Sequence, residues 1–175
     1  MKIIILGPTG SGKGTQSSFI CKLLKLRHIG TGKIFRKEAK KNKFIKKLLN
    51  EGKLIPDNIT IKIVNKLIKK DNFILYGFPR TLKQARALKF TPDLVLLLKV
   101  DKKHIIRRLL LRKRFDDNRK NIEERYKIYL KKTLPVINYY KKKKLLIKIN
   151  GNPNIKEVNK KIKKVSEEIK EVLRS

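Results

Sequence analysis

A glycine-rich stretch near the N-terminus has the residue types and spacing of a phosphate-binding loop. The sequence LGPTGSGKGT, residues 6–15, follows a short apolar run and places Lys13 directly after a glycine. Glycines permit backbone conformations in which successive N–H groups face one anion, and the N-terminus of a following helix strengthens that field. The lysine would bring a full positive charge to the outer phosphates of a nucleotide. We therefore expect a phosphate site here, with an ordinary glycine turn between a strand and a helix as the alternative.

A second candidate site is the stretch YGFPRT, residues 76–81, which also follows an apolar run. Pro79 stiffens this turn, and the planar guanidinium of Arg80 suits a pair of phosphate oxygens. Such a turn with a solvated arginine is common when it occurs alone. Together with the first loop, it predicts a site that holds several phosphate groups.

Short strands that alternate with amphipathic helices must position these two loops. Apolar runs without polar alternation predict strands that are covered on both faces. Asn154 and Glu157 resemble a capping box at the start of a long helix. We expect Asp57 to cap another helix, and Pro135 to kink a third that spans 122–140. The expected strands are 3–6, 27–29, 73–76, 94–98 and 145–149.

This alternation predicts an α/β fold, and specifically a three-layer phosphate-loop fold in which helices cover a five-stranded parallel sheet. Ligands in this class bind at the carboxyl ends of the strands. We expect a single domain over residues 1–175. Residues 30–55 show helical patterns but no strand, which indicates a small helical insertion.

The charge composition restricts the classes of function. Lys and Arg number 48 against 14 Asp and Glu, a formal net charge of +34 over 175 residues. The lysines are spread over the whole length, without a basic tail or an aromatic-interleaved stretch, so we expect only incidental nucleic-acid binding at low salt. Cys21 is the only cysteine, which excludes an intrachain disulfide, and no apolar run could span a bilayer. These features favour a reducing cytoplasm and no membrane partner, and we interpret His28 and His104 as structural.

Together the motifs closely resemble the adenylate kinase family of nucleoside monophosphate kinases. GPTGSGKGTQ is similar to the family's G-x-P-G-x-G-K-G-T-Q, with its proline one place early. GTGKIFR, GKLIPD, YGFPRTLKQA, RRLLLRKRFDDN and EERYKIY follow in the family's order along nearly the whole chain. The resemblance implies reversible phosphoryl transfer from ATP to AMP, giving two ADP, by an enzyme that we expect to be a monomer.

The resemblance also implies which residues form the site. Phosphoryl transfer mainly needs positioning and charge neutralisation, so we expect many arginines and few bases. The residues implied in catalysis are Lys13, Arg80, Arg108, Arg112, Arg114 and Arg125. Those implied in ATP binding are Gly10, Ser11, Gly12, Lys13, Gly14, Thr15, Arg108 and Arg112. Those implied in AMP binding are Thr31, Arg36, Ile55, Gly77, Arg80, Gln84, Arg114 and Arg125.

Acceptor choice depends on Thr31 and Gln84. In adenylate kinases the corresponding residues face the adenine of AMP, whereas uridylate and cytidylate kinases usually have Ala or Gly and Asn there. Thr31 could instead cap a helix. A UMP/CMP kinase is one alternative, and a degenerate member that binds nucleotide or RNA without turnover is another. Asp116 and Asp117 resemble the family's aspartate pair, which would orient Arg114 and its neighbours, with a helix N-cap as the alternative.

Three departures from the family pattern are expected to affect the metal and the lid. The family has acids where Tyr76 and Lys33 stand, and Gly14 has no hydroxyl, so we assign no metal ligand. We expect Mg²⁺ to be carried by the phosphates of ATP. The lid is reduced to a vestigial segment at 112–116, which should exclude water less well and permit some ATP hydrolysis without AMP.

Overall fold

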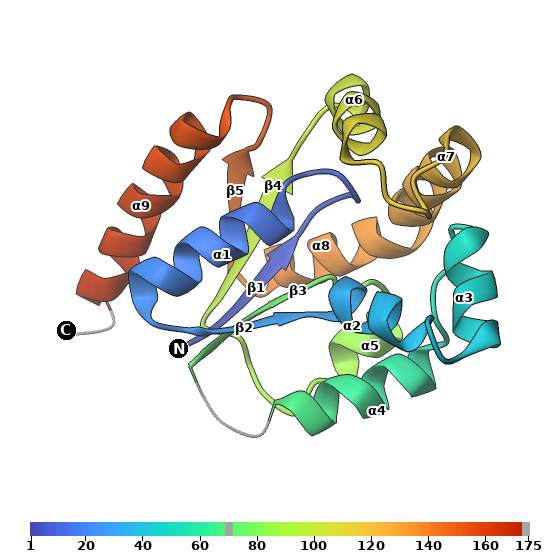
Figure 1. The fold of residues 1–175 in the computed structure, drawn as a ribbon. Helices are drawn as coiled ribbons and strands as arrows, with labels where there is room; N and C mark the ends of the chain where they lie inside the picture. Colours follow the sequence, from blue (N-terminus) through green and yellow to red (C-terminus); the bar gives the residue numbers. More distant parts are fainter. Residues whose placement is uncertain (69–71, 173–175) are drawn as a thin grey trace.

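The computed structural model describes residues 1–68 and 72–172 and has an α/β fold around a parallel sheet (Figure 1). The strands are β1 (Lys2–Leu6), β2 (Arg27–Gly30), β3 (Phe73–Tyr76), β4 (Leu94–Lys99) and β5 (Leu146–Asn150). They form one five-stranded sheet in the order β2-β3-β1-β4-β5, with all neighbours parallel. The predicted fold class is confirmed, and every predicted strand is found with its ends displaced by at most one residue.

Helices cover both faces of this sheet, as Figure 1 shows. One face is covered by α1 (Lys13–Leu24) and α9 (Ile155–Val172). The other is covered by α4 (Asp57–Leu67), α5 (Leu82–Arg86) and α8 (Leu134–Lys142). The remaining helices are α2 (Thr31–Glu38), α3 (Lys43–Asn50), α6 (Lys102–Arg112), α7 (Arg119–Ile128) and the π-helical segment η1 (Tyr129–Thr133).

The central strand β1 contributes to two separate hydrophobic cores. Ile4 and Leu6 pack toward α4, α5 and α8, whereas Ile3 and Ile5 pack toward α1 and α9. Successive side chains of a strand point to opposite faces, which explains why this run lacks polar residues. Each fully buried Ile or Leu contributes about 1.5–3 kcal/mol. The glycine loop that follows β1 is therefore attached to a strand that is buried in both cores.

The segment 30–55 contains α2 and α3, which have a small core of their own. Phe35, Ala39, Ile45 and Ile55 form this core, with partly buried residues of α4 against it. Gly30, at the start of the segment, is the last residue of β2. Residues 113–118 connect α6 directly to α7. This short link leaves no room for a separate lid domain between the two helices.

Three local expectations need correction. The helix over 122–140 is interrupted by η1, and Pro135 lies in the first turn of α8, where its missing N–H costs little. Asp57 does not cap α4, because the N-cap is Pro56 and the carboxylate of Asp57 accepts hydrogen bonds from Thr81 and Gln84 instead. Thr31 is the first residue of α2 and not its N-cap. Within the part of the chain that the structure describes, no helix is both long and apolar enough to cross a bilayer.

Candidate active site

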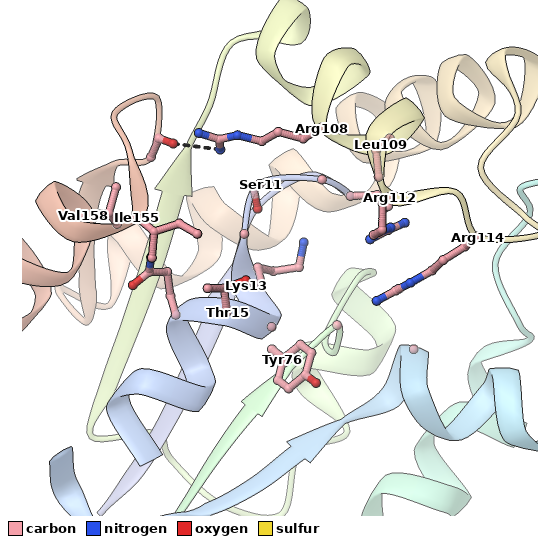
Figure 2. A pocket seen from close by; sticks show the side chains of 18 of the residues that line it. Ser11, Lys13, Thr15, Tyr76, Arg108, Leu109, Arg112, Arg114, Ile155 and Val158 are labelled. Carbon is pink, nitrogen blue, oxygen red and sulfur yellow. Dashed lines mark hydrogen bonds between the residues drawn. The ribbon is translucent and has the colours of Figure 1, made fainter. Parts of the chain in front are cut away.

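A cavity of about 1150 Å³ lies at the carboxyl ends of β1 and β3 (Figure 2). Its walls come from the glycine loop, α1, α2, α6 and the β5–α9 loop. Among the described residues that line it, none is an aspartate or glutamate. The cationic residues in its lining are Lys13, Lys33, Arg36, Arg80, Arg108, Arg112, Arg114 and Lys156. This cleft is suited to a polyanion.

The glycine loop takes a shape that side chains would prevent. Gly7, Gly10 and Gly12 have φ values of 142°, 87° and 90°, in the region that favours glycine. A Cβ atom on Gly10 would lie 2.8 Å from Cγ of Leu109, so a side chain there would collide with α6. Gly12 is the N-cap of α1, whose first N–H groups lack intrahelical partners. The loop and the helix terminus together form an anion site.

Lys13 is held inside this loop. Its Nζ donates to the carbonyl oxygens of Gly7 and Pro8, both at 2.7 Å. Burial lowers the pKa of Lys13 well below its usual value, and the charges of Arg80 and Arg112 lower it further. A bound phosphate would place a negative charge beside the ammonium group and would favour its protonated form.

Arg80 lines both this cleft and a second, smaller cavity beside it. Its Nε donates to the carbonyl oxygen of Gly77 at 2.9 Å. Burial lowers the pKa of Arg80 to about 10, and the charges of Arg125 and Arg36 add to that effect. The guanidinium therefore stands at the junction of two cavities, among other cations.

Asp116 and Asp117 are buried and hold two arginines by charge-assisted hydrogen bonds. Arg112 donates from Nε and Nη2 to the two oxygens of Asp117, both at 2.7 Å. Arg125 donates to Oδ2 of Asp116 at 2.6 Å and to Oδ1 of Asp117 at 3.2 Å. The pair was expected to orient Arg114 and its neighbours. The neighbours Arg112 and Arg125 are held, whereas the structure gives Arg114 no hydrogen bond to either carboxylate.

The alternative of a helix cap does not apply to this pair. Asn118 is the N-cap of α7, and its side chain accepts from the N–H of Asn121. Arg114 is exposed in the link between α6 and α7 and reaches into the cleft (Figure 2). Burial lowers the pKa of Arg36, and the charge of Arg114 lowers it further, so these two cations face the same space.

Arg108 projects from α6 across the same cleft and binds the β5–α9 loop on its far side. Its guanidinium donates to the carbonyl oxygens of Gly151, Asn152 and Pro153 at 2.9, 3.1 and 3.3 Å. Figure 2 shows it extended toward the β5–α9 loop, away from Arg112. The spacing of four residues between the two arginines therefore does not bring their charges onto one target.

Tyr76 forms the wall between the glycine loop and β2. Its ring stacks on that of His28, with centroids 4.9 Å apart. A Cβ atom on Gly30 would lie 2.2 Å from Cζ of Tyr76, and one on Gly14 would lie 3.6 Å from the ring. Burial raises the pKa of Tyr76, so the phenol stays neutral. An uncharged ring thus stands where the adenylate kinase family usually has an acid.

The second cavity, of about 60 Å³, lies between α2, α3 and α5. Of the residues implied in AMP binding, it is lined by Thr31, Arg36, Ile55, Gly77, Arg80, Gln84 and Arg125. The eighth, Arg114, lines the large cleft, as do all residues implied in ATP binding. The structure therefore brings the two expected sets together as two adjoining cavities. The residues that line both are Thr9, Gly32, Arg36, Gly77 and Arg80.

Two groups of residues were not expected from the sequence. The β5–α9 loop contributes Gly151, Pro153 and Asn154 to the cleft. This loop follows the carboxyl end of a strand, and that position in the sequence could have identified it as part of the site. Asp57 and Thr81 form hydrogen bonds with Gln84, and no sequence signal pointed to this contact, because Asp57 lies 27 residues away from Gln84.

The lining of the cleft does not fit a magnesium ion held by the protein. Mg²⁺ prefers oxygen ligands, usually one or two carboxylates together with substrate phosphates. The described residues contain no group of three or more His, Cys, Asp or Glu side chains that could hold a metal. The nearest carboxylates that we identify, Asp116 and Asp117, are already paired with arginines.

Comparison with known proteins agrees with this geometry. The sequence model of the family described as "Adenylate kinase" matches residues 5–145. An adenylate kinase of Buchnera aphidicola subsp. Cinara cedri is 40% identical, over 93% of this chain and 95% of the relative. One from Prochlorococcus marinus (strain MIT 9515) is 38% identical, over 92% and 96%. One from Clostridium botulinum (strain Hall) is 35% identical, over 90% and 94%.

Proposed function

Because the chain belongs to the adenylate kinase family, it is an ATP:AMP phosphotransferase, and we propose that the cations lining its cleft carry out the phosphoryl transfer. The observation that carries this proposal is the charge of the lining, with eight cationic side chains and no carboxylate among its described residues. Transfer of a phosphoryl group needs in-line positioning and neutralised charge more than it needs a base.

In the proposed arrangement, the phosphates of ATP lie on the glycine loop and Lys13. The base of ATP lies toward the β5–α9 loop, where Arg108 holds the wall through its bonds to 151–153. The phosphate of AMP lies against Arg80, Arg36 and Arg125, which line the smaller cavity. That cavity, of about 60 Å³, is too small for a nucleotide, so the insertion around α2 and α3 must shift to admit AMP.

The reaction then takes place at the junction of the two cavities. An oxygen of the AMP phosphate attacks the γ-phosphorus of ATP, and the bond from that phosphorus to the β–γ bridging oxygen breaks. Each nucleotide becomes ADP. Arg80, which lines both cavities, stays in contact with the group throughout, while Arg112 and Arg114 neutralise its charge from the side of α6.

We infer that AMP is the preferred acceptor because Thr31 and Gln84 line the smaller cavity and are both almost fully buried. A coupled assay with ATP and each of AMP, UMP and CMP tests this. We expect the highest kcat/KM with AMP. Preference for UMP or CMP would instead favour the pyrimidine kinase, and absence of any turnover would leave a nucleotide-binding protein without catalysis.

Magnesium dependence is a further test. Adenylate kinases generally use Mg²⁺ together with ATP, and the cleft has no carboxylate to help hold it. We expect the wild type to need a higher free Mg²⁺ concentration for half-maximal activity than Tyr76→Asp, which places an acid beside the glycine loop. Activity measured against free Mg²⁺ at constant ATP checks this. Saturation of the wild type at the lower concentration would contradict it.

The short link between α6 and α7 leads to a prediction about water exclusion. With residues 113–118 as the whole connection, we expect the cleft to stay more open than in kinases with a lid domain. The enzyme should therefore hydrolyse ATP slowly in the absence of AMP. Phosphate release with ATP alone measures this rate, with Lys13→Ala as the background. A wild-type rate equal to that background would refute the prediction.

The wider setting of the enzyme is also a proposal. We infer that it works as a cytoplasmic monomer, and membership of the adenylate kinase family supports this inference. The net charge of +34 supports incidental binding to nucleic acid at low salt.

A further inference from the structure

We propose that Asp57 is a positioning residue that fixes the orientation of the Gln84 amide, so that the acceptor cavity selects a 6-amino purine and rejects a 6-oxo purine. Asp57 lies at the start of α4 and does not line the cavity. It would act only through Gln84. The inference rests on the proposed assignment of the smaller cavity to the acceptor nucleotide.

The amide of Gln84 has one partner at each end. Its Nε2 donates to Oδ1 of Asp57 at 2.7 Å, and its Oε1 accepts from the backbone N–H of Arg80 at 2.7 Å. Gln84 is 2% exposed, so water cannot easily replace either partner. Both bonds are short, and the first links Gln84 to a residue that does not line the cavity.

The chemistry of these partners decides which way the amide faces. The oxygen and nitrogen of a glutamine side chain have nearly the same shape, so shape alone does not orient them. An ionised carboxylate only accepts, and a backbone N–H only donates. Turning the amide over would place its oxygen against Asp57 and its nitrogen against the N–H of Arg80. Both hydrogen bonds would then be lost.

Asp57 is itself held in place by Thr81. The hydroxyl of Thr81 donates to Oδ2 of Asp57 at 2.9 Å and accepts from the N–H of Gln84 at 3.1 Å. Since the single hydroxyl hydrogen is used on Asp57, this carboxylate acts as an acceptor at both oxygens. The side chains of Asp57, Thr81 and Gln84, together with the backbone N–H of Gln84, thus form a closed network whose donor and acceptor directions are all determined.

This network leaves Gln84 one pattern of hydrogen-bond donor and acceptor to offer to the base of the nucleotide. A primary amide has two hydrogens and two lone pairs, so Gln84 retains one donor at Nε2 and one acceptor at Oε1. Adenine offers an amino group at position 6 and an acceptor at N1, which match. Hypoxanthine and guanine offer an oxygen at position 6 and a hydrogen on N1, which oppose both. The network therefore sets specificity without touching the nucleotide.

The test compares AMP with IMP, which differ at position 6 of the purine. We expect wild-type kcat/KM to favour AMP on the order of 10³-fold, because a hydrogen-bonding site rejects a mismatched partner strongly. Asp57→Asn keeps the shape but can offer an NH₂ group to a turned amide. It should lower the AMP:IMP ratio about tenfold, partly by raising kcat/KM for IMP. Thr81→Val should lower the ratio less, with Thr81→Ser, which keeps the hydroxyl, as its matched control.

The dependence on Gln84 separates positioning from a general structural effect. Gln84→Met removes the amide, so Asp57→Asn added to it should leave the AMP:IMP ratio unchanged. Equal losses for AMP and IMP in Asp57→Asn, with an unchanged ratio, would overturn the proposal. A wild-type ratio retained by Gln84→Met would do so as well. Wild-type turnover of AMP, measured in the same series, reports separately whether the proposed acceptor is correct. If Asp57→Asn unfolds, the two Thr81 variants decide the question.

Discussion

Arg80→Ala is expected to lower kcat/KM for ATP and AMP on the order of 10³-fold or more, as for other arginines that stabilise a transferring phosphoryl group. Arg80 lines both cavities, so it can contact the group before, during and after transfer. Most of the loss should appear in kcat, because the interaction strengthens as charge develops in the transition state. Steady-state kinetics with both nucleotides varied would measure it.

The backbone at Arg80 should survive this change. Its N–H donates to Gln84, and its carbonyl oxygen accepts from the hydroxyl of Thr133 at 3.0 Å. Arg80→Lys keeps the charge but not the planar fork, so we expect only partial recovery. Arg86→Ala, which truncates an exposed arginine of α5, is the matched control and should behave as wild type. A loss below tenfold in Arg80→Ala would reassign this arginine to a structural role.

Lys13→Ala should reduce kcat/KM by a similar factor, because the ammonium is the only lysine inside the glycine loop. The same substitution should not lower the free energy of unfolding. Burial and the charges of Arg80 and Arg112 lower the pKa of Lys13, so the unfolded chain binds this proton more tightly than the folded chain. At neutral pH the charge therefore opposes folding. We expect the ligand-free variant to be at least as stable as wild type in denaturant unfolding.

Lys22→Ala is the control for this pair of measurements, since Lys22 lies on the exposed side of the same helix. It should alter neither activity nor stability appreciably. Loss of activity together with a large loss of stability in Lys13→Ala would show that the lysine supports the loop's shape through its bonds to Gly7 and Pro8. The catalytic assignment would then fail.

Local sequence patterns predicted the fold well. Buried runs such as 73–76 predict strands because their side chains face two cores, and that requirement is visible in four consecutive residues. The glycine loop was equally visible, because Gly10 and Gly12 require a backbone that other residues avoid. The π-helical segment η1 was not visible, since it depends on how α7 and α8 pack in three dimensions.

Contacts between distant segments could not be predicted from the same patterns. Asp57 has the residue type of a helix cap, and only the fold brings it to Gln84. Arg108 and Arg112 lie four residues apart on one helix, yet Arg108 binds the β5–α9 loop and Arg112 binds Asp117. The partners of long polar side chains are set by which loops meet at the end of the sheet, and short sequence windows do not contain that information.

The cationic lining of the cleft has a consequence for the lifetime of the protein in a cell. Ligand-free, the fold must tolerate many like charges at close range, and a nucleotide relieves that repulsion when it binds. A ligand present at a hundred times its Kd stabilises the folded state by about 2.7 kcal/mol. Cells rich in adenine nucleotides would thus preserve this kinase, whereas starved cells would expose it to unfolding and proteolysis. Supply of its own substrates would set its abundance.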